Sequence, residues 1–237
     1  MCGRFAQYRI AYEYLDKIGA QLPLPLLGGA SPEPIGRYNV PPRSNVQLLH
    51  QDADGLRMDP VPWGYAPWWA HGKRPPAINA RVETAATSKF FRDVWGTGRA
   101  IVPADGWFEW KKDERNPKIK QPYFITLRSG EPMFFAAIGQ FQRGGMLEPR
   151  DGDGFVIITS SNDDGMLDIH DRRPLVFSGE CAAHWMDPEL APGEAEELAL
   201  EHGEGVDGFE WYAVGREIGN VRNEGARLIA PINDPLL

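Results

Sequence analysis

Short apolar segments separated by proline and glycine dominate the pattern of hydrophobic and polar positions along this chain. The 237 residues include 21 prolines and 26 glycines, which divide the sequence into pieces that favour short strands over long helices. Several of these pieces are brief apolar runs typical of buried strands. The predicted strands are Ala100–Pro103, Trp107–Lys111, Tyr123–Leu127, Met133–Ile138, Phe155–Thr159 and Phe209–Val214.

A hairpin is predicted where Val46–His50 and Leu56–Val61 flank Asp52–Gly55, because an Asp-Gly pair between apolar runs is a strong turn signal. Helical spacing of apolar side chains predicts Tyr12–Ile18, Thr84–Trp95, Cys181–Met186 and Glu194–Glu201 as helices. Of the remaining segments, Pro23–Pro42 is predicted to be an ordered surface connector and Lys111–Lys120 an exposed lysine-rich loop. The tail up to Leu237 is predicted to be irregular.

These elements predict one α+β domain over residues 1–237, with curved, mostly antiparallel sheets forming an open barrel-like core and a few short helices. No apolar run approaches the ~18–20 residues of a membrane span, so we expect a cytoplasmic protein with no membrane partner. Two cysteines cannot build a disulfide framework, which agrees with a reducing compartment. The five histidines are scattered and no CxxC or HExxH occurs, so we expect neither a metal nor a cofactor.

Charge is distributed unevenly along the chain, although the net charge is −8. Residues 71–122 contain eleven Lys or Arg and six Asp or Glu. Residues 151–210 contain only two Arg, and sixteen Asp or Glu. A basic region beside an acidic one is compatible with an anionic ligand on one face. It is equally compatible with an acidic, solvated helix at 189–204, so charge alone does not decide between them.

The second residue, Cys2, carries the most distinctive chemistry. Because residue 2 is small, we expect an aminopeptidase to remove Met1 and leave cysteine at the N-terminus. Its α-amine and thiol then lie on adjacent carbons, with ordinary pKa values of about 8 and about 8.5. Such an aminothiol can act as an acyl-transfer nucleophile, or condense with an aldehyde and close a thiazolidine ring. A cysteine that merely packs near the terminus is the simpler alternative.

Other reactive side chains lie in apolar surroundings. If Glu109 points inward from its aromatic strand, burial raises its pKa and makes it an acid/base group near neutrality; an outward-facing glutamate is the commoner case. His170 has Asp168 and Asp171 close by, and acidic partners orient and tune an imidazole, although a lone histidine is more often structural. Three further residues alternate before the predicted helix: Asn79, Arg81 and Glu83.

Six short motifs occur in order along the chain: Met1–Phe5, Tyr38–Pro42, Trp63–Tyr65, Asn79–Thr84, Asp105–Trp110 and His170–Pro174. Together they resemble the motifs of the SOS response-associated peptidase (SRAP) family, from residue 2 to about Pro231. The resemblance implies that Cys2 condenses with the ring-opened C1′ aldehyde of an abasic site in single-stranded DNA. It also implies that the product is a stable thiazolidine cross-link that shields the lesion, with AP lyase (β-elimination) as a side activity.

The same resemblance implies roles for individual residues. Glu109 and His170 share the acid/base steps, while Asn79 orients the Cys2 amine or binds the sugar oxygens. The implied phosphate-binding cations are Arg4, Arg81, Arg172 and Lys89. The implied pair of stacking aromatic residues is Trp68 and Trp69, and two weaker candidates in the same channel are Asn39 and Thr159. Core packing is the alternative for at least one tryptophan. Pro67 and an insertion at Ala70–Lys73 depart from the family pattern, so the reach of this loop is in question.

Three functions follow as hypotheses. The first is a monomeric protein that cross-links to abasic sites, with a bare single strand or a junction with duplex as its DNA partner. The second is an N-terminal-cysteine thiol peptidase or hydrolase. Autocatalytic removal of Met1 would reconcile such an activity with the cross-linking role. A peptidase requires an oxyanion hole and a peptide groove, and has no need of phosphate-binding arginines. The third is a non-enzymatic single-strand binding module, which would tolerate the loss of Cys2.

Overall fold

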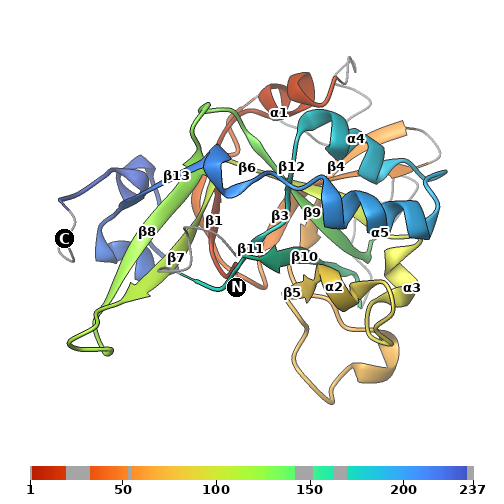
Figure 1. Ribbon diagram of the computed structural model, residues 1–237, viewed down its shortest axis with the longest axis horizontal. Coiled ribbons are helices and arrows are strands. Elements are labelled where there is room, and N and C mark those ends of the chain that lie inside the picture. Colours follow the sequence, from red (N-terminus) through yellow and green to blue (C-terminus); the bar gives the residue numbers. More distant parts are fainter. Residues whose placement is uncertain (1, 20–32, 53–54, 142–151, 163–169, 234–237) are drawn as a thin grey trace.

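Two twisted sheets form the framework of the protein in a computed structural model that describes residues 2–19, 33–52, 55–141, 152–162 and 170–233 (Figure 1). The smaller sheet has the strand order β13-β8-β7-β1-β2. The larger has the order β11-β10-β9-β6-β3-β4, with β12 beside β9 and β5 beside β10. Every strand pair is antiparallel except β5 with β10 among the described residues. The strands of the smaller sheet are β1 (Phe5–Gln7), β2 (Arg37–Val40), β7 (Gly106–Lys112), β8 (Lys120–Leu127) and β13 (Phe209–Ala213).

The larger sheet is buried on both faces, which explains why its strands are continuous apolar runs. On β10, Phe155 and Ile157 face the cluster between the sheets, whereas Val156 and Ile158 face the helices. This alternation follows from the two-residue period of a strand. The strands are β3 (Asn45–Asp52), β4 (Gly55–Pro62), β5 (Asn79–Arg81), β6 (Arg99–Ala104), β9 (Met133–Gln140), β10 (Gly154–Ser161), β11 (Arg172–Pro174) and β12 (Val176–Phe177).

Short helices pack on the outer face of the larger sheet and bury its second row of side chains (Figure 1). Trp185 of the first C-terminal helix is fully buried there, edge-on to Trp95 at a centroid separation of 5.4 Å. No helix in the described part of the chain is long and apolar enough to cross a membrane. The helices are α1 (Ala11–Lys17), α2 (Val82–Ala85), α3 (Arg92–Trp95), α4 (Gly179–Met186) and α5 (Pro192–Glu201).

The predicted α+β class, the 46–61 hairpin and the six named strands are confirmed, and the sheets stay open. The prediction of one helix over Thr84–Trp95 is wrong, because the chain folds into α2 and α3 with a turn between them. Ser88 caps this turn, its Oγ accepting a hydrogen bond from the Phe90 amide. The turn lets both Phe90 and Phe91 pack against Tyr65, which a continuous helix would not allow.

Short strands account for the other differences. The Pro23–Pro42 connector contains β2, and residues 20–32 of it lie outside the described residues. The strands β1, β5, β11 and β12 have two or three residues each, too few to show a periodic pattern. The tail includes two 3-10 turns, Arg216–Gly219 and Ala226–Ile229. Cys181 lies in α4 as expected, half-buried at the edge of the helical cluster.

We expect Arg99→Met to lower the free energy of unfolding by about 3 kcal/mol, measured by urea denaturation. Arg99 is 5% exposed, and its loss leaves buried carbonyl oxygens without a donor. The control is Arg92→Met, which should change stability by less than about 0.5 kcal/mol, since that side chain is 60% exposed. Equal effects of the two variants would contradict this role. The carbonyls bound by Arg99 belong to Trp95, Gly96, Trp185, Asp187 and Leu190.

Candidate active site

The start of the chain is part of the smaller sheet, and this places Cys2 in the apolar cluster between the two sheets. Strand β1 pairs with β2 on one side and with β7 on the other. The backbone carbonyl of Arg4 accepts a hydrogen bond from the Phe108 amide, which extends this pairing toward the terminus. Cys2 is fully buried in the apolar cluster that contains Phe5 and Trp63.

Asn79 fixes the backbone of Cys2. Its Nδ2 donates a hydrogen bond to the Cys2 carbonyl at 2.8 Å, across 77 residues of sequence. Asn79 reaches this position because β5 pairs in parallel with β10. Its buried Oδ1 accepts no hydrogen bond within the described part of the chain, so an acceptor is available beside the terminus. The structure therefore brings these two predicted residues together.

Glu109 points inward from β7 and is 5% exposed. Burial raises the pKa of Glu109 to about 7, the amino group at the start of the chain opposes that rise, and Asp171 adds to it. Burial, followed by the charge of Glu109, raises the pKa of the Cys2 thiol far above its usual range. Of the two orientations left open by the sequence, the structure shows the inward-facing one, and the Cys2 thiol is held in its neutral form.

His170 completes the group. Its Nδ1 lies 2.7 Å from Asp171 Oδ1 and accepts a hydrogen bond from the Arg172 amide at 3.1 Å. Burial lowers the pKa of His170, the amino group at the start of the chain lowers it further, and Asp171 opposes both. The same amino group, that of Met1, thus contributes to the pKa shifts of Cys2, Glu109 and His170. Asp168, the other predicted neighbour, lies outside the described residues.

The guanidinium of Arg172 is bound to two residues, Glu83 and Thr159. Its Nη1 and Nη2 donate to the two carboxylate oxygens of Glu83 at 2.6 and 2.9 Å, and Nη2 also donates to the Thr159 carbonyl. This bidentate bond lowers the pKa of Glu83. Glu83 was singled out in the sequence only by its alternation with Asn79 and Arg81. The structure shows that it orients Arg172, and through the Arg172 backbone it supports His170.

The other predicted DNA contacts differ in exposure. Asn39 is fully buried, and its Oδ1 accepts a hydrogen bond from the half-buried Arg4 guanidinium. Thr159 is 1% exposed, with its hydroxyl donating to the Ala80 carbonyl. Arg81 is exposed and forms no hydrogen bond or ion pair through its side chain within the described residues. Arg81 is therefore the arginine of this group most open to a phosphate.

The two tryptophans also differ in their exposure to solvent. Trp68 lies in the 3-10 turn Trp68–Ala70 and is 82% exposed, whereas Trp69 packs edge-on against Phe90 at 5.8 Å. Lys89 is exposed, and its ammonium lies 5.3 Å from the centre of the Trp69 ring. One tryptophan is thus free to stack on a base, and the other holds the loop in place.

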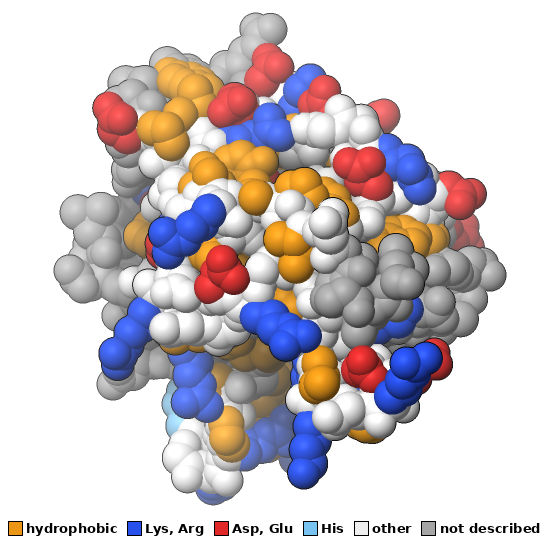
Figure 2. Space-filling model, turned by 90° about the vertical axis from the view of Figure 1, so that its left-hand side faces the viewer, with side chains coloured by type: hydrophobic (Ala, Val, Ile, Leu, Met, Phe, Trp, Pro, Cys, Tyr) orange, Lys and Arg blue, Asp and Glu red, His pale blue; other side chains and the backbone are white. Residues whose placement is uncertain are grey.

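Basic side chains gather on one face of the molecule. Figure 2 shows Lys and Arg around a hollow in the lower half of this face, with most Asp and Glu above it or toward its edges. A cationic rim around an apolar hollow can hold an anionic chain that also carries rings.

Known proteins resemble this chain over most of its length. The family model for SOS response associated peptidase (SRAP) matches residues 1–221. The abasic site processing protein YedK of Escherichia coli is 48% identical over 98% of this chain and 100% of its own length. The abasic site processing protein HMCES of Pongo abelii is 29% identical, over 83% of this chain and 65% of its own length.

Solved structures share the fold. A phage-related protein of Bordetella bronchiseptica has a TM-score of 0.75 and 35% identity, over 90% of this chain and 94% of its own. A protein of Bacteroides thetaiotaomicron has the same TM-score at 19% identity, covering 98% of this chain and 100% of its own, which shows the fold alone. The family match and the full-length relatives confirm what the motifs predicted: the chain belongs to the SOS response-associated peptidase family.

Proposed function

We propose that this protein senses abasic sites in single-stranded DNA and forms a covalent cross-link to them through Cys2, once Met1 has been removed. The observation that carries the proposal is the convergence of Cys2, Asn79, Glu109 and His170 on the start of the chain. Relatives that span the whole chain are named abasic site processing proteins, which supports the choice of lesion. The exposed Arg81 and Trp68 supply a cation for the phosphate and a ring for a base.

The cross-link forms in two balanced steps. The Cys2 amine attacks the C1′ aldehyde of the ring-opened sugar, and loss of one water leaves an imine. The thiol sulfur then adds to the imine carbon while its proton passes to nitrogen, which closes the thiazolidine. The second step is intramolecular, so a largely neutral thiol suffices at a high effective concentration. The imine also acidifies the C2′ protons, and β-elimination of the 3′ phosphate is the expected side reaction.

Glu109 is the proposed acid and base of this sequence. Opening the sugar requires a proton to reach the ring oxygen, and imine formation requires one for the departing water. A carboxyl group with a pKa of about 7 is protonated often enough to give these protons and ionised often enough to take them back. His170, held by Asp171 and Arg172, shares the proton transfers at the sugar.

The thiol hydrolase hypothesis is less well supported. A thiol peptidase attacks as a thiolate, yet burial raises the pKa of the Cys2 thiol and keeps it neutral. Condensation through the amine uses the same residue without this difficulty. The exposed cation and ring beside the site have a role in binding DNA and none in cleaving a peptide.

We expect Cys2→Ala to abolish the covalent adduct and to leave DNA affinity unchanged, because only the ring-closing atom is lost. Cys2→Ser should also give no heat-stable adduct, since an oxazolidine is far more labile than a thiazolidine. The measurement is a denaturing gel with intact-mass analysis, using an oligonucleotide with one abasic site and an undamaged control. A normal adduct with Cys2→Ala would overturn the mechanism. No adduct from wild-type protein that lacks Met1 would favour the hydrolase.

We expect Glu109→Gln to slow cross-linking about 10²-fold or more and to change its pH dependence. In the wild type the protonated acid declines as the pH rises above the Glu109 pKa of about 7, while the attacking amine becomes more available. These opposite trends give a bell-shaped profile, and the variant should lose the descending limb. Single-turnover adduct formation between about pH 5.5 and pH 9 measures it. A wild-type rate and profile for the glutamine variant would refute this role.

We expect Arg81→Ala and Arg172→Ala to have different consequences. Loss of the exposed Arg81 should weaken DNA binding, reduce the slope of log affinity against log salt by about 0.7, and leave the melting temperature unchanged. Loss of Arg172 should lower the free energy of unfolding by about 1–3 kcal/mol and slow cross-linking, because Glu83 and the Thr159 carbonyl lose their donor. Fluorescence anisotropy at several salt concentrations and thermal melts compare the two, and identical effects would contradict the assignment.

A further inference from the structure

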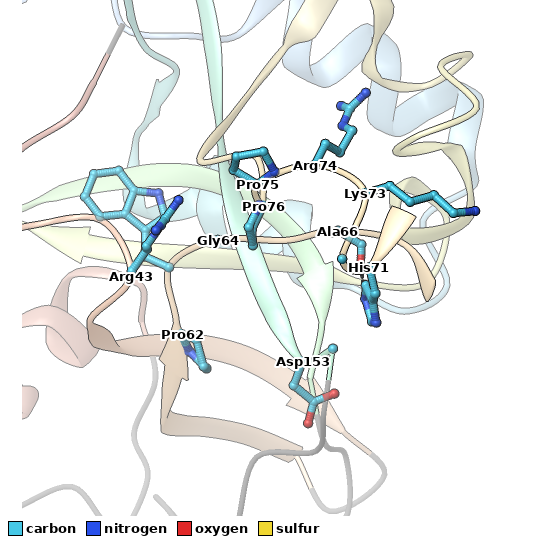
Figure 3. Close-up of a pocket in the computed structure, with 13 residues that line it drawn as sticks. Arg43, Pro62, Gly64, Ala66, His71, Lys73, Arg74, Pro75, Pro76 and Asp153 are labelled. Carbon is cyan, nitrogen blue, oxygen red and sulfur yellow. Dashed lines mark hydrogen bonds between the residues drawn. The ribbon is translucent and has the colours of Figure 1, made fainter. Parts of the chain in front are cut away.

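A cavity of about 880 Å³ lies beside the active site and takes no part in the chemistry described above (Figure 3). Its walls come from the turn at Arg43, the Pro62–Ala66 segment, the loop from His71 to Pro76, and the residues that precede β10. In size it falls within the range of small-ligand sites. Figure 3 shows Arg43 on one side of it and Lys73 on the other, with Asp153 below.

The cavity shares a wall with the active site. Trp63 lines it and is fully buried, with its ring 5.2 Å from that of Phe5 in the cluster that contains Cys2. The Trp63 Nε1 donates to the Ile78 carbonyl, in the residue before Asn79. Pro76 in the cavity wall and Asn79 are three residues apart, which corresponds to about 10 Å of extended chain. A strand of DNA with its abasic sugar at Cys2 would reach the cavity with a neighbouring nucleotide.

The lining is cationic. Arg43, Lys73 and Arg74 line the cavity with Asp153 as the carboxylate among them. The side chains of Arg43 and Lys73 form no ion pair or hydrogen bond within the described part of the chain. Arg74 lies over the Phe90 ring, 3.9 Å from its centre, and points away from the cavity. Two exposed cations on opposite sides of an apolar hollow are thus available to an anion.

Arg43 has a backbone conformation that is strained for any residue with a side chain. Arg43 has a φ of 67°, and every other residue with a positive φ in the described part of the chain is a glycine. Glycine is the residue that adopts this conformation without strain. The Arg43 amide donates to the Trp63 carbonyl at 2.9 Å, which holds the strained residue at the cavity rim. A site where glycine would fold more easily, but which carries arginine, points to a function for the guanidinium.

We propose that this cavity is a second nucleic-acid subsite, which binds a nucleotide flanking the abasic site in the same single strand. Arg43 and Lys73 bind the two backbone phosphates that flank this nucleotide, one at each side of the cavity, and the proline walls at Pro62, Pro75 and Pro76 contact the sugar and base. Guanidinium and ammonium groups suit phosphate oxygens, and proline rings offer apolar contact without further donors. The inference rests on the proposed function. It adds the place on the protein at which the DNA strand is bound next to the abasic site.

The test separates this subsite from the cross-linking step. Anisotropy with a tetrahydrofuran analogue, which cannot form an imine, reports non-covalent binding alone. One oligonucleotide is a trinucleotide with the analogue at its centre, and others extend by several nucleotides on the 5′ side, the 3′ side or both. Wild-type protein should bind the form extended toward the cavity more tightly than the trinucleotide.

Arg43→Gly and Lys73→Ala should each remove most of this gain, lowering affinity for the extended strand about tenfold while affinity for the trinucleotide stays unchanged. The salt slope should fall by about 0.7 with the extended strand. Arg43→Gly should melt at or above the wild-type temperature, because glycine relieves the strain. The charge control is Arg128→Ala, an exposed arginine in the turn after β8, and should not distinguish the two lengths.

The proposal would be overturned if the variants lost affinity equally for the trinucleotide and the extended strand. It would also be overturned if Lys73→Ala lost no affinity for the extended strand. If Arg43→Gly lowers the melting temperature, its side chain is structural, and the result for Lys73→Ala decides the matter by itself. Cross-linking of a true abasic trinucleotide is measured in parallel. Its absence in the wild type would refute the proposed function, while the length dependence would still test the cavity.

Discussion

The burial of Cys2 between the two sheets, next to strand β1, is the constraint on which the rest of the site depends. A chain terminus is usually frayed and solvated, and its ordering must be offset by strong local contacts. Here β1 is paired on both edges, and Asn79 binds the Cys2 backbone from a strand far away in sequence. The Cys2 thiol and Glu109 therefore share one buried, low-dielectric site, and the charge of Glu109 contributes to the raised pKa of the thiol.

Burial has different consequences for the Cys2 thiol and for the Glu109 carboxyl group. It disfavours the thiolate, which would weaken a nucleophile that acts alone. It also raises the pKa of Glu109 toward neutrality, which favours proton transfer to a sugar and from an amine. The same desolvation thus suppresses one kind of cysteine chemistry and supports the other. This balance is the physical reason to prefer aldehyde condensation over thiol hydrolysis.

Charged side chains around the site divide into two groups by exposure. Arg172 and Glu83 form a bidentate pair that also holds the backbone next to His170, so they maintain geometry. Arg81, Lys89 and the ring of Trp68 are open to solvent and can meet a ligand without breaking internal bonds. Preformed internal pairs keep the reactive groups in position while exposed cations provide a salt-dependent attraction.

The sequence by itself determined the six longer strands named from it, the hairpin, the family and the chemistry open to an N-terminal cysteine. These follow from short-range features: runs buried on both faces, an Asp-Gly turn, ordered motifs, and two functional groups on adjacent carbons. The break between α2 and α3 depended on aromatic packing against Tyr65, so helical spacing alone predicted one helix over Thr84–Trp95. Only the tertiary structure decided that Glu109 points inward, that Glu83 holds Arg172 across 89 residues, and that a cationic cavity adjoins Trp63. Burial and long-range pairing set these properties, and no local pattern of residues encodes them.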